Sequence, residues 1–132
     1  MEKYDKQIDL PVSIIVLDLD ELKKWNDTLG HAKGDALIKQ TAAILNSFAS
    51  DRLTISRIGG DEFVLIGEAF TEKDTEGLIR NIFERLEASN QENGTNLCLS
   101  VGSAASLRSI GCMDSLFREA DKKMYTHKNS KK

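Results

Sequence analysis

The sequence predicts an α+β fold in which helices cover a mixed central β-sheet, close to a βαββαβ ferredoxin-like plan with an added helix. Three observations predict it. Short β-branched and apolar runs alternate with longer stretches in which apolar residues recur at helical spacing. A Gly-Gly turn joins two of the short runs. The length of 132 residues is enough for one domain with one core and leaves no room for a second.

The first half of the chain contains a strand and two helices. Pro11 precedes the β-branched, apolar run 12–17, which predicts a buried strand. A short helix is expected over 21–28, with Asp20 as its cap. A longer helix is expected over 35–49, because one face carries Leu37, Ile38, Thr41, Ala42, Leu45 and Phe48.

A β-hairpin is expected next. The strand-like runs 53–58 and 63–66 flank Gly59-Gly60. Tight primed turns need a positive φ that only glycine adopts without cost, so the pair predicts such a turn.

A helix, a strand and a final helix complete the prediction. Thr71 and Asp74 resemble a capping pair, which opens a helix with the apolar stripe Leu78, Ile79, Ile82, Phe83 and Leu86. Alternating apolar residues over 97–101 predict a strand with one face on a core. The last helix is expected over 114–128, with Leu116, Phe117, Ala120 and Met124 facing inward.

Composition narrows the class of protein. A net charge of −3 argues against a general nucleic-acid binder. The longest apolar run is too short to span a bilayer, and the charged start is unlike a signal peptide. Cys98 and Cys112 have no metal-site spacing and are expected to be buried free thiols. We expect a cytoplasmic domain without nucleic-acid or membrane contact, although the parent protein could be membrane-anchored.

Acidic residues mark two places that the fold could bring together. Asp61 and Glu62 directly follow the Gly-Gly pair, and Asp18 and Asp20 lie on one side of the first strand's end. If that strand pairs with the hairpin, Asp18 and Asp61 meet at an edge where Mg²⁺ and phosphate oxygens could bind. The alternative, equally open from this motif alone, is that Asp20 caps a helix and Asp18 is a solvated strand end.

The stretch between the first strand and the long helix allows two interpretations. Lys23 could hold phosphate near a helix start, or lie on a solvated face. Asn26 and Asp35 have the donors and acceptors of a guanine pocket, but residues 26–35 would also serve to end one helix and begin another. His31 alone indicates a turn residue more often than a catalytic base.

Four segments, in order and at matching spacing, resemble the GGDEF family of diguanylate cyclases. Residues 18–35 are similar to the family's DxDxFKxxNDxxGHxxGD motif, and residues 57–63 carry the signature itself. Residues 99–102 and 118–128 resemble its later SxG and RADxALYxAK segments. The resemblance runs through nearly the whole chain, so residues 1–132 are expected to form one GGDEF domain.

The resemblance implies a nucleotide cyclase palm-like core that joins two GTP molecules into cyclic di-GMP and releases pyrophosphate. Two Mg²⁺ or Mn²⁺ ions per active site would neutralise phosphate charge and lower the pKa of the attacking ribose 3′-hydroxyl. Since each half-site would hold one GTP, turnover would need a homodimer with two domains face to face.

The resemblance also implies roles by position. Asp18, the carbonyl of Leu19 and Asp61 would ligate the metal ions. Lys23 would stabilise charge on the phosphates, and Asp61 or Glu62 would accept the hydroxyl proton, with Asp61 favoured. The remaining substrate contacts would come from Asn26, His31, Asp35, Gly59, Gly60, Lys128 and Lys132.

Several positions depart from the family pattern. Ser50 and Leu53 replace the arginine and aspartate of the usual RxxD feedback motif, so product inhibition through that site is expected to be absent. Leu22 replaces the aromatic residue of DxDxFK. Lys131 and Lys132 replace the glycine and arginine of the closing AKxxGRN segment, which weakens a bidentate grip on phosphate.

The family's N-terminal DxLTGLxNR segment has no match, and residues 1–8 look like the tail of the helix that follows it. We therefore expect a fragment of a longer signalling protein with an N-terminal sensor or regulatory domain. The main alternative is a catalytically inactive GTP-binding domain that controls a partner domain. A phosphoryl-transfer palm domain of polymerase type would use metal ions on carboxylates in the same way, but it does not explain the guanine pocket expected at residues 26–35.

Overall fold

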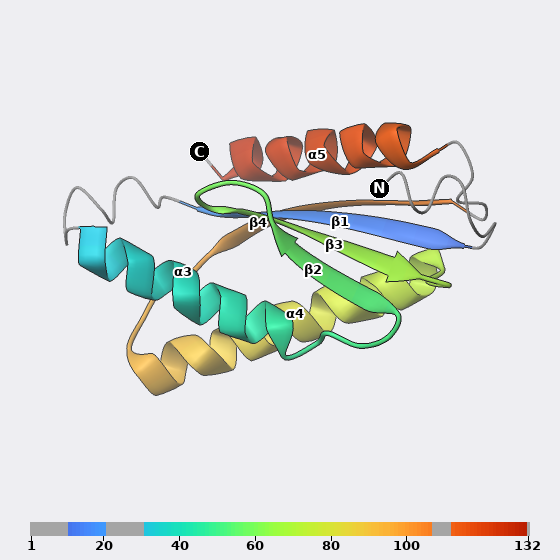
Figure 1. Ribbon diagram of the computed structural model, residues 1–132. Coiled ribbons are helices and arrows are strands. Elements are labelled where there is room, and N and C mark those ends of the chain that lie inside the picture. Colours follow the sequence, from blue (N-terminus) through green and yellow to red (C-terminus); the bar gives the residue numbers. More distant parts are fainter. Residues whose placement is uncertain (1–10, 21–30, 107–111, 132) are drawn as a thin grey trace.

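The computed structural model describes residues 11–20, 31–106 and 112–131, and places a central sheet between helices on its two faces (Figure 1). In chain order, the described elements are β1 (Val12–Leu19), α3 (His31–Asn46), β2 (Leu53–Arg57), β3 (Glu62–Glu68), α4 (Glu72–Asn93), β4 (Leu99–Ser106) and α5 (Met113–Ser130). The helix expected over 21–28 lies outside these residues. Among the described helices, none has both the length and the apolar character to cross a membrane.

The sheet has the strand order β2-β3-β1-β4. This is the order of a ferredoxin-like βαββαβ unit, so the expected α+β class is confirmed. All three described strand pairs are antiparallel, however, so the expectation of a mixed sheet is wrong. The reason is that β1 and β2 run in the same direction but β3 lies between them, and strands of like direction are never neighbours.

Alternation along β1 divides the core into two layers. Ile15, Leu17 and Leu19 pack with the apolar faces of α3 and α4, whereas Val12, Ile14 and Val16 pack with α5. Figure 1 shows α5 on one face of the sheet and α3 and α4 on the other. Every residue of β1 is buried, as the β-branched run predicts for a strand covered on both faces.

Helix α4 confirms its predicted start. The Thr71 side chain accepts a hydrogen bond from the Asp74 amide, and the Asp74 side chain accepts one from the Thr71 amide. Helix α5 confirms its buried face of Leu116, Ala120 and Met124. It packs so closely on β4 that a Cβ at Gly102 would collide with backbone atoms of Ala120 and Met124.

Helix α3 begins four residues before and ends three residues before the predicted bounds of 35–49. Gly34 lies inside its first turns and is buried, so it does not mark a boundary. At the other end, Ser47 donates to the carbonyls of Ala43 and Ile44, which tightens the chain into a turn. Phe48 still packs against the core from beyond the helix.

The β2–β3 hairpin forms as expected, but its turn does not. Residues 58–61 make a four-residue loop, closed by a 2.9 Å bond from the Ile58 amide to the Glu62 carbonyl. Neither Gly59 nor Gly60 has a positive φ, so the predicted primed turn is wrong. The chain reverses its direction over four residues instead of two. The Arg57 guanidinium donates to the carbonyls of Gly59 and Gly60 at 3.0 and 2.8 Å.

Two smaller expectations change as well. Strand β4 starts at Leu99 rather than Leu97, because the Asn90 side chain bonds both backbone groups of Leu97 and keeps it out of the ladder. Cys98 and Cys112 were expected to be buried, but Cys98 is exposed and Cys112 is half-buried. Cys98 directly precedes β4, which begins at Leu99.

Candidate active site

Asp18 is a buried carboxylate at the end of β1. Its backbone pairs with Glu62 of β3 on one side and Ser100 of β4 on the other, and it is 5% exposed. One oxygen, Oδ2, lies 2.7 Å from the Lys128 ammonium of α5. The other, Oδ1, is buried and has no hydrogen-bond partner among the described residues. The interpretation of Asp18 as a solvated strand end is therefore wrong.

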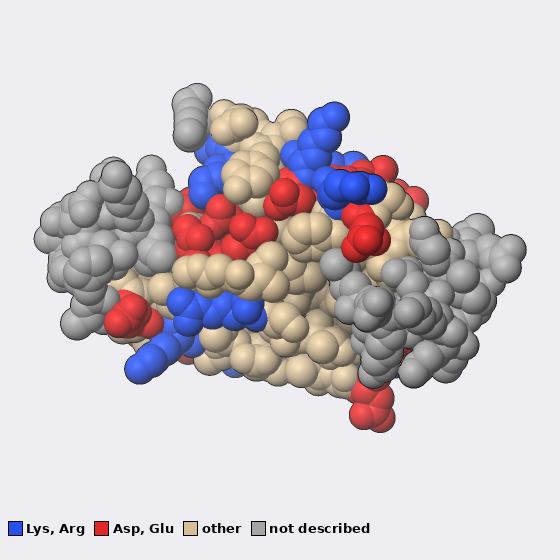
Figure 2. All heavy atoms as spheres, turned by 45° about the horizontal axis from the view of Figure 1, so that its top comes forward, with Lys and Arg blue, Asp and Glu red and all other residues tan. Residues whose placement is uncertain are grey.

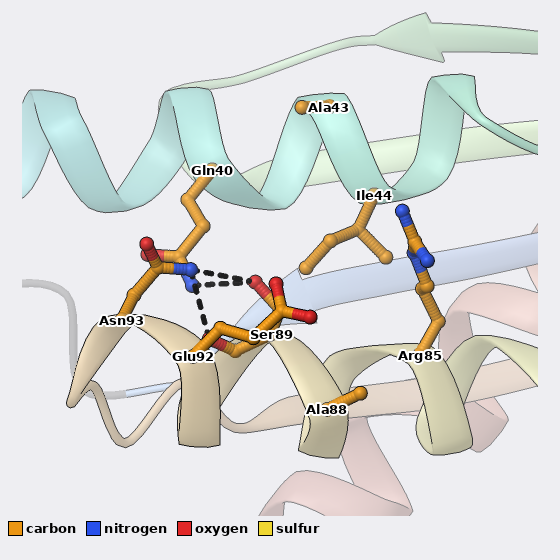
Figure 3. A pocket seen from close by; sticks show the side chains of 8 residues that line it. All are labelled: Gln40, Ala43, Ile44, Arg85, Ala88, Ser89, Glu92 and Asn93. Carbon is orange, nitrogen blue, oxygen red and sulfur yellow. Dashed lines mark hydrogen bonds between the residues drawn. The ribbon is translucent and has the colours of Figure 1, made fainter.

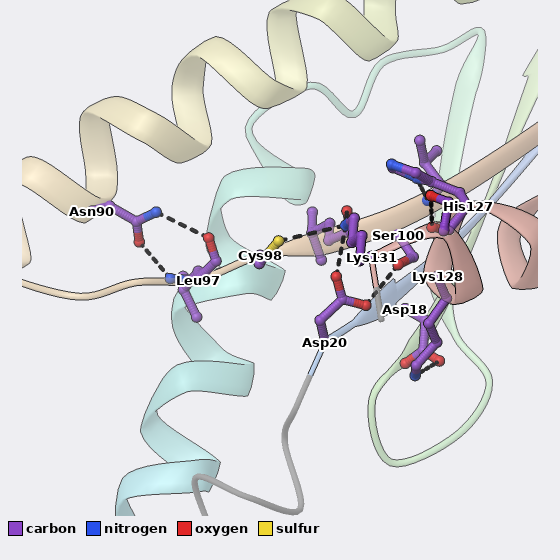
Figure 4. A network of polar contacts seen from close by, with 12 residues as sticks. Asp18, Asp20, Asn90, Leu97, Cys98, Ser100, His127, Lys128 and Lys131 are labelled. Carbon is purple, nitrogen blue, oxygen red and sulfur yellow. Dashed lines mark hydrogen bonds and ion pairs between the residues drawn. The ribbon is translucent and has the colours of Figure 1, made fainter.

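Asp20 lies on the same side of the strand but is fully satisfied. Oδ1 accepts a 2.6 Å bond from the Ser100 hydroxyl, and Oδ2 pairs with Lys131 at 2.7 Å (Figure 4). Burial alone would raise the pKa of Asp20, but hydrogen bonds from Lys131, Ser100 and Cys98 outweigh burial and lower it. A capping role toward residues 21–28 falls outside the described residues.

Asp61 joins the hairpin loop to the end of β1. Its carbonyl accepts a 2.8 Å hydrogen bond from the Leu19 amide, next to Asp18. The Asp61 carboxylate lies close enough to Asp18 that its charge acts on the Asp18 pKa. The predicted pairing of the first strand with the hairpin is confirmed. Three sequence-predicted site residues, Asp18, Leu19 and Asp61, are thus brought together.

Asp18, Asp61 and Glu62 form an acidic site, and Asp121 of α5, which the sequence did not assign to it, belongs to it as well. Burial raises the pKa of Glu62, and the charges of Asp121, Asp18 and Asp61 raise it further. Asp121 projects from α5, and together with Glu62 it also raises the pKa of exposed Tyr125. Figure 2 shows acidic side chains gathered between basic ones on this side of the molecule. The only hint in the sequence was helical spacing: Asp121 and Tyr125 are four residues apart and therefore lie on one face of α5.

Two opposing effects set the pKa values of the Asp18–Lys128 ion pair: burial favours the uncharged form of each group, and the attraction between the two groups favours the charged form. The pKa of Asp18 is raised because burial, reinforced by Asp61, outweighs the stabilising bond from Lys128. The pKa of Lys128 is also raised: burial lowers it, but Asp18, Asp61 and Asp20 together have the larger effect. Lys128 is thus held as a cation in a strongly negative setting.

The structure describes some of the remaining predicted site residues and not others. Gly59 and Gly60 form the exposed loop beside Asp61. Asp35 is exposed in the first part of α3, a helix that begins at the end of the sheet where β1 ends (Figure 1). His31 belongs to α3, but its side chain is not among those described. Lys23, Asn26 and Lys132 lie outside the described residues.

The two loop glycines are not required by the chain itself. A Cβ at Gly59 would meet only the Glu62 Cβ, at 3.7 Å, and one at Gly60 would meet nothing within 4 Å. Neither position needs a positive φ. Glycine therefore leaves open backbone next to Asp61, as close approach by a ligand requires.

The described residues fit a metal ion that shares its coordination with a substrate. Over the described part of the chain, no group of three or more His, Cys, Asp or Glu side chains is placed to hold a metal ion. Mg²⁺ commonly takes only one or two carboxylates and completes its shell with water and phosphate oxygens. Asp18, with its unpartnered Oδ1, and neighbouring Asp61 meet that requirement.

Two hollows lie away from the acidic site. One, of about 220 Å³, lies between α3 and α4, where Gln40 bonds Ser89 and where Arg85 and Glu92 also line it (Figure 3). The other, of about 470 Å³, lies among α4, β4 and the end of α5. Neither of these two hollows is lined by Asp18, Asp61 or Glu62.

A family model described as "Diguanylate cyclase, GGDEF domain" matches residues 1–132. Among curated relatives, diguanylate cyclase DgcS of Shewanella oneidensis is 34% identical over 123 residues, which cover 90% of this chain and 40% of that protein. Diguanylate cyclase VdcA of Vibrio cholerae is 33% identical over 124 residues, which cover 89% and 36%. The chain thus spans two fifths or less of the length of these relatives.

Solved structures agree with the sequence relatives. The GGDEF domain of DgcB from Caulobacter crescentus, in complex with c-di-GMP, superposes with a TM-score of 0.79 at 25% identity, covering 93% of this chain and 73% of that one. An EAL/GGDEF domain protein from M. capsulatus gives 0.73 at 32% identity, covering 92% and 80%. Matched along its whole length by the family model and over most of it by these folds, the chain belongs to the GGDEF family of diguanylate cyclases.

Proposed function

We propose that the protein containing this domain condenses two GTP molecules into cyclic di-GMP and releases pyrophosphate, with the help of Mg²⁺ or Mn²⁺. The observation that carries the proposal is the buried, unpartnered Oδ1 of Asp18 beside Asp61. A buried carboxylate oxygen without a partner is costly, and a cation that binds with the substrate removes that cost. Family membership supplies the reaction class.

The reaction is an in-line attack of one ribose 3′-oxygen on the α-phosphorus of the facing GTP. Metal ions, when bound, neutralise phosphate charge and acidify the attacking hydroxyl. Asp18, the Leu19 carbonyl and Asp61 would hold them, two per site. Asp61 or Glu62 accepts the hydroxyl proton as the new P–O bond forms and the bond to pyrophosphate breaks. The second bond forms in the same way with the two nucleotides exchanging roles.

Substrate recognition uses the two ends of the site. Asn26 and Asp35 bond the guanine edge, with His31 beside them. Lys23, Lys128 and Lys132 hold the phosphates, and Gly59 and Gly60 let them approach the backbone of the loop. Lys128 already lies at the site as a cation, 2.7 Å from Asp18, which supports its role.

The same ion pair favours a second candidate function. Lys128 covers one oxygen of Asp18, and a metal ion has to compete with it. A domain in which Lys128 never leaves Asp18 would bind GTP weakly or without reaction, and would act as a regulatory GTP-binding domain for a partner.

Turnover requires a homodimer, because each domain holds one GTP and the two must face each other. We also place the domain in a longer cytoplasmic or membrane-anchored signalling protein with an N-terminal sensor or regulatory domain. Among solved relatives, the diguanylate cyclase SiaD from Pseudomonas aeruginosa is in complex with its activator SiaC, which shows that a family member takes a protein partner.

The test is conversion of GTP by the purified protein fused to a dimerising coiled coil, followed by chromatography of the nucleotides. We expect cyclic di-GMP from the wild type with Mg²⁺, and none from Asp61→Ala. Glu84→Ala, which removes an exposed carboxylate of α4 far from the loop, is the matched control and should keep full activity. Product from Asp61→Ala would contradict the assigned role, and GTP binding without product would favour the regulatory function.

A further inference from the structure

Helix α5 ends without the usual glycine cap. Its C-cap residue is Lys131, with φ −89° and ψ −5°, whereas the C-cap residue of α4 is Gly94, with φ 64°. A left-handed residue normally satisfies the last carbonyls of a helix, and an end that lacks one tends to fray. Among the described residues, the carbonyls at the end of α5 accept bonds from the Lys131 amide, to Lys128 at 3.3 Å and to Asn129, and the His127 carbonyl accepts a 2.7 Å bond from the Ser130 hydroxyl.

The Lys131 side chain attaches this end of the helix to the sheet. The Lys131 ammonium donates at 2.7 Å to Asp20 Oδ2, at 2.7 Å to the Leu99 carbonyl and at 3.4 Å to Cys98 Sγ (Figure 4). Together these contacts tie the end of α5 to the ends of β1 and β4. One turn earlier, His127 Nδ1 accepts a 2.9 Å bond from the Val101 amide on the outer edge of β4.

Lys131 has no donor left for a substrate, and each oxygen of Asp20 already has a partner within the domain. An ammonium has three donors, and all three of Lys131 have partners. Both oxygens of Asp20 are also occupied, by Ser100 and Lys131. The two residues therefore differ from Asp18 and Lys128, which form a single contact with each other and keep an unpartnered oxygen.

We propose that Lys131 and Asp20 form a positioning pair, which holds the last turn of α5 so that the Lys128 side chain stays within reach of both Asp18 and the phosphates of bound GTP. This inference rests on the proposed function and names a residue that acts through Lys128. Lys128 and Lys131 are three residues apart, so they share one face of the same turn. When that turn frays, Lys128 loses the backbone that directs it.

The test compares variants of the full chain. Lys131→Met removes the ammonium but keeps the length of the side chain, and Lys131→Arg restores the charge. Lys123→Met is the matched control, because Lys123 is 60% exposed on the same helix and only pairs with Glu119 at 3.9 Å. The measurements are amide hydrogen exchange along α5, GTP affinity, and kcat and KM for cyclic di-GMP formation.

We expect Lys131→Met to speed exchange of the amides at 127–131 about tenfold, while the first turns of α5 are unchanged. We expect GTP KM to rise about 5–10-fold with kcat within about twofold, since phosphate binding weakens and chemistry does not. Lys131→Arg should recover most of both effects, and Lys123→Met should match the wild type. Asp20→Asn should reproduce Lys131→Met, and combining the two should add little.

Unchanged exchange at 127–131 in Lys131→Met overturns the proposal, as does faster exchange with unchanged GTP affinity. A fall in kcat alone, or a melting transition shared by the whole domain, indicates a purely structural role and overturns it too. Wild-type protein that binds GTP without forming product overturns the proposed function. The positioning role of Lys131 is then decided by amide exchange at 127–131 and by GTP affinity. Wild-type protein that binds no GTP overturns both.

Discussion

At the scale of single residues, Asp18 and Asp20 look alike in the sequence and differ in the folded chain. Asp20 has both oxygens bonded and a lowered pKa, whereas Asp18 has one bare oxygen and a raised pKa. Burial of a carboxylate stabilises a fold only when its bonds compensate for lost water. Asp20 therefore serves the structure, and Asp18 is left available for a ligand.

Asp20 predicts a specific acid sensitivity. Its pKa is lowered from the ordinary 3.8, so its ionised form stabilises the fold above that pH, and this contribution is lost as the pH falls through the lowered value. Urea unfolding at pH 7 and pH 3 measures it. The Asp20→Asn variant should lose stability at pH 7 and show a smaller further loss at pH 3 than the wild type. Equal losses on acidification would contradict this.

The Asp18–Lys128 pair predicts coupled effects on stability. Lys128→Met leaves a buried, unpaired carboxylate and should cost about 1–3 kcal/mol in unfolding free energy at pH 7. Adding Asp18→Asn removes the stranded charge and should recover most of the loss. Chemical denaturation of both single variants and the double variant gives the coupling energy. Additive losses would show that the two side chains do not interact in solution.

Neither pair could be found by reading the sequence. Asp20 and Lys131 are 111 residues apart, and nothing in either neighbourhood indicates the other. The sequence did predict that Asp18 and Asp61 meet, because that follows from pairing β1 with the hairpin. It did not predict that Asp18 would be buried under α5, since burial depends on how the last helix crosses the sheet.

At the scale of elements, local signals predicted the described helices and strands well and the hairpin loop poorly. The capping box at Thr71 and the apolar stripe of α4 are local features, and both are confirmed. The loop at 58–61 depends on Arg57, whose side chain bonds two loop carbonyls and allows a longer turn than Gly-Gly suggests. A pattern of residue types does not include that contact.

Gly60 and Gly102 are expected to be needed for different reasons, Gly60 for substrate binding and Gly102 for packing. Gly60→Ala meets no atom within 4 Å, so it should change unfolding free energy by less than about 0.5 kcal/mol. It should nevertheless raise GTP KM about fivefold, because a methyl group would stand where phosphate approaches the loop. Gly102→Ala should cost about 1–3 kcal/mol, because α5 packs directly on that position.

Thermal unfolding and GTP kinetics on both variants provide the measurement. A large loss of stability in Gly60→Ala would show that the loop needs glycine for its own conformation. Unchanged kinetics in that variant would remove the loop backbone from the substrate site.

At the scale of the whole molecule, one end of the sheet collects the elements of the site. The end of β1, the β2–β3 loop and the last turn of α5 meet there, although they are far apart in the chain. Two core layers hold this end from opposite faces of the sheet. Leu53, which stands where the family's feedback motif has its aspartate, is 3% exposed and part of the core, and the absence of product inhibition through that motif stays a prediction.

We propose that two such sites, face to face, join two GTP molecules. The most direct measurement is the yield of cyclic di-GMP and pyrophosphate from GTP and Mg²⁺ by the protein held as a dimer, beside the same protein as a monomer. The account predicts one cyclic di-GMP and two pyrophosphates for every two GTP consumed by the dimer, with far slower turnover by the monomer. GTP bound by the dimer but recovered unchanged would contradict it.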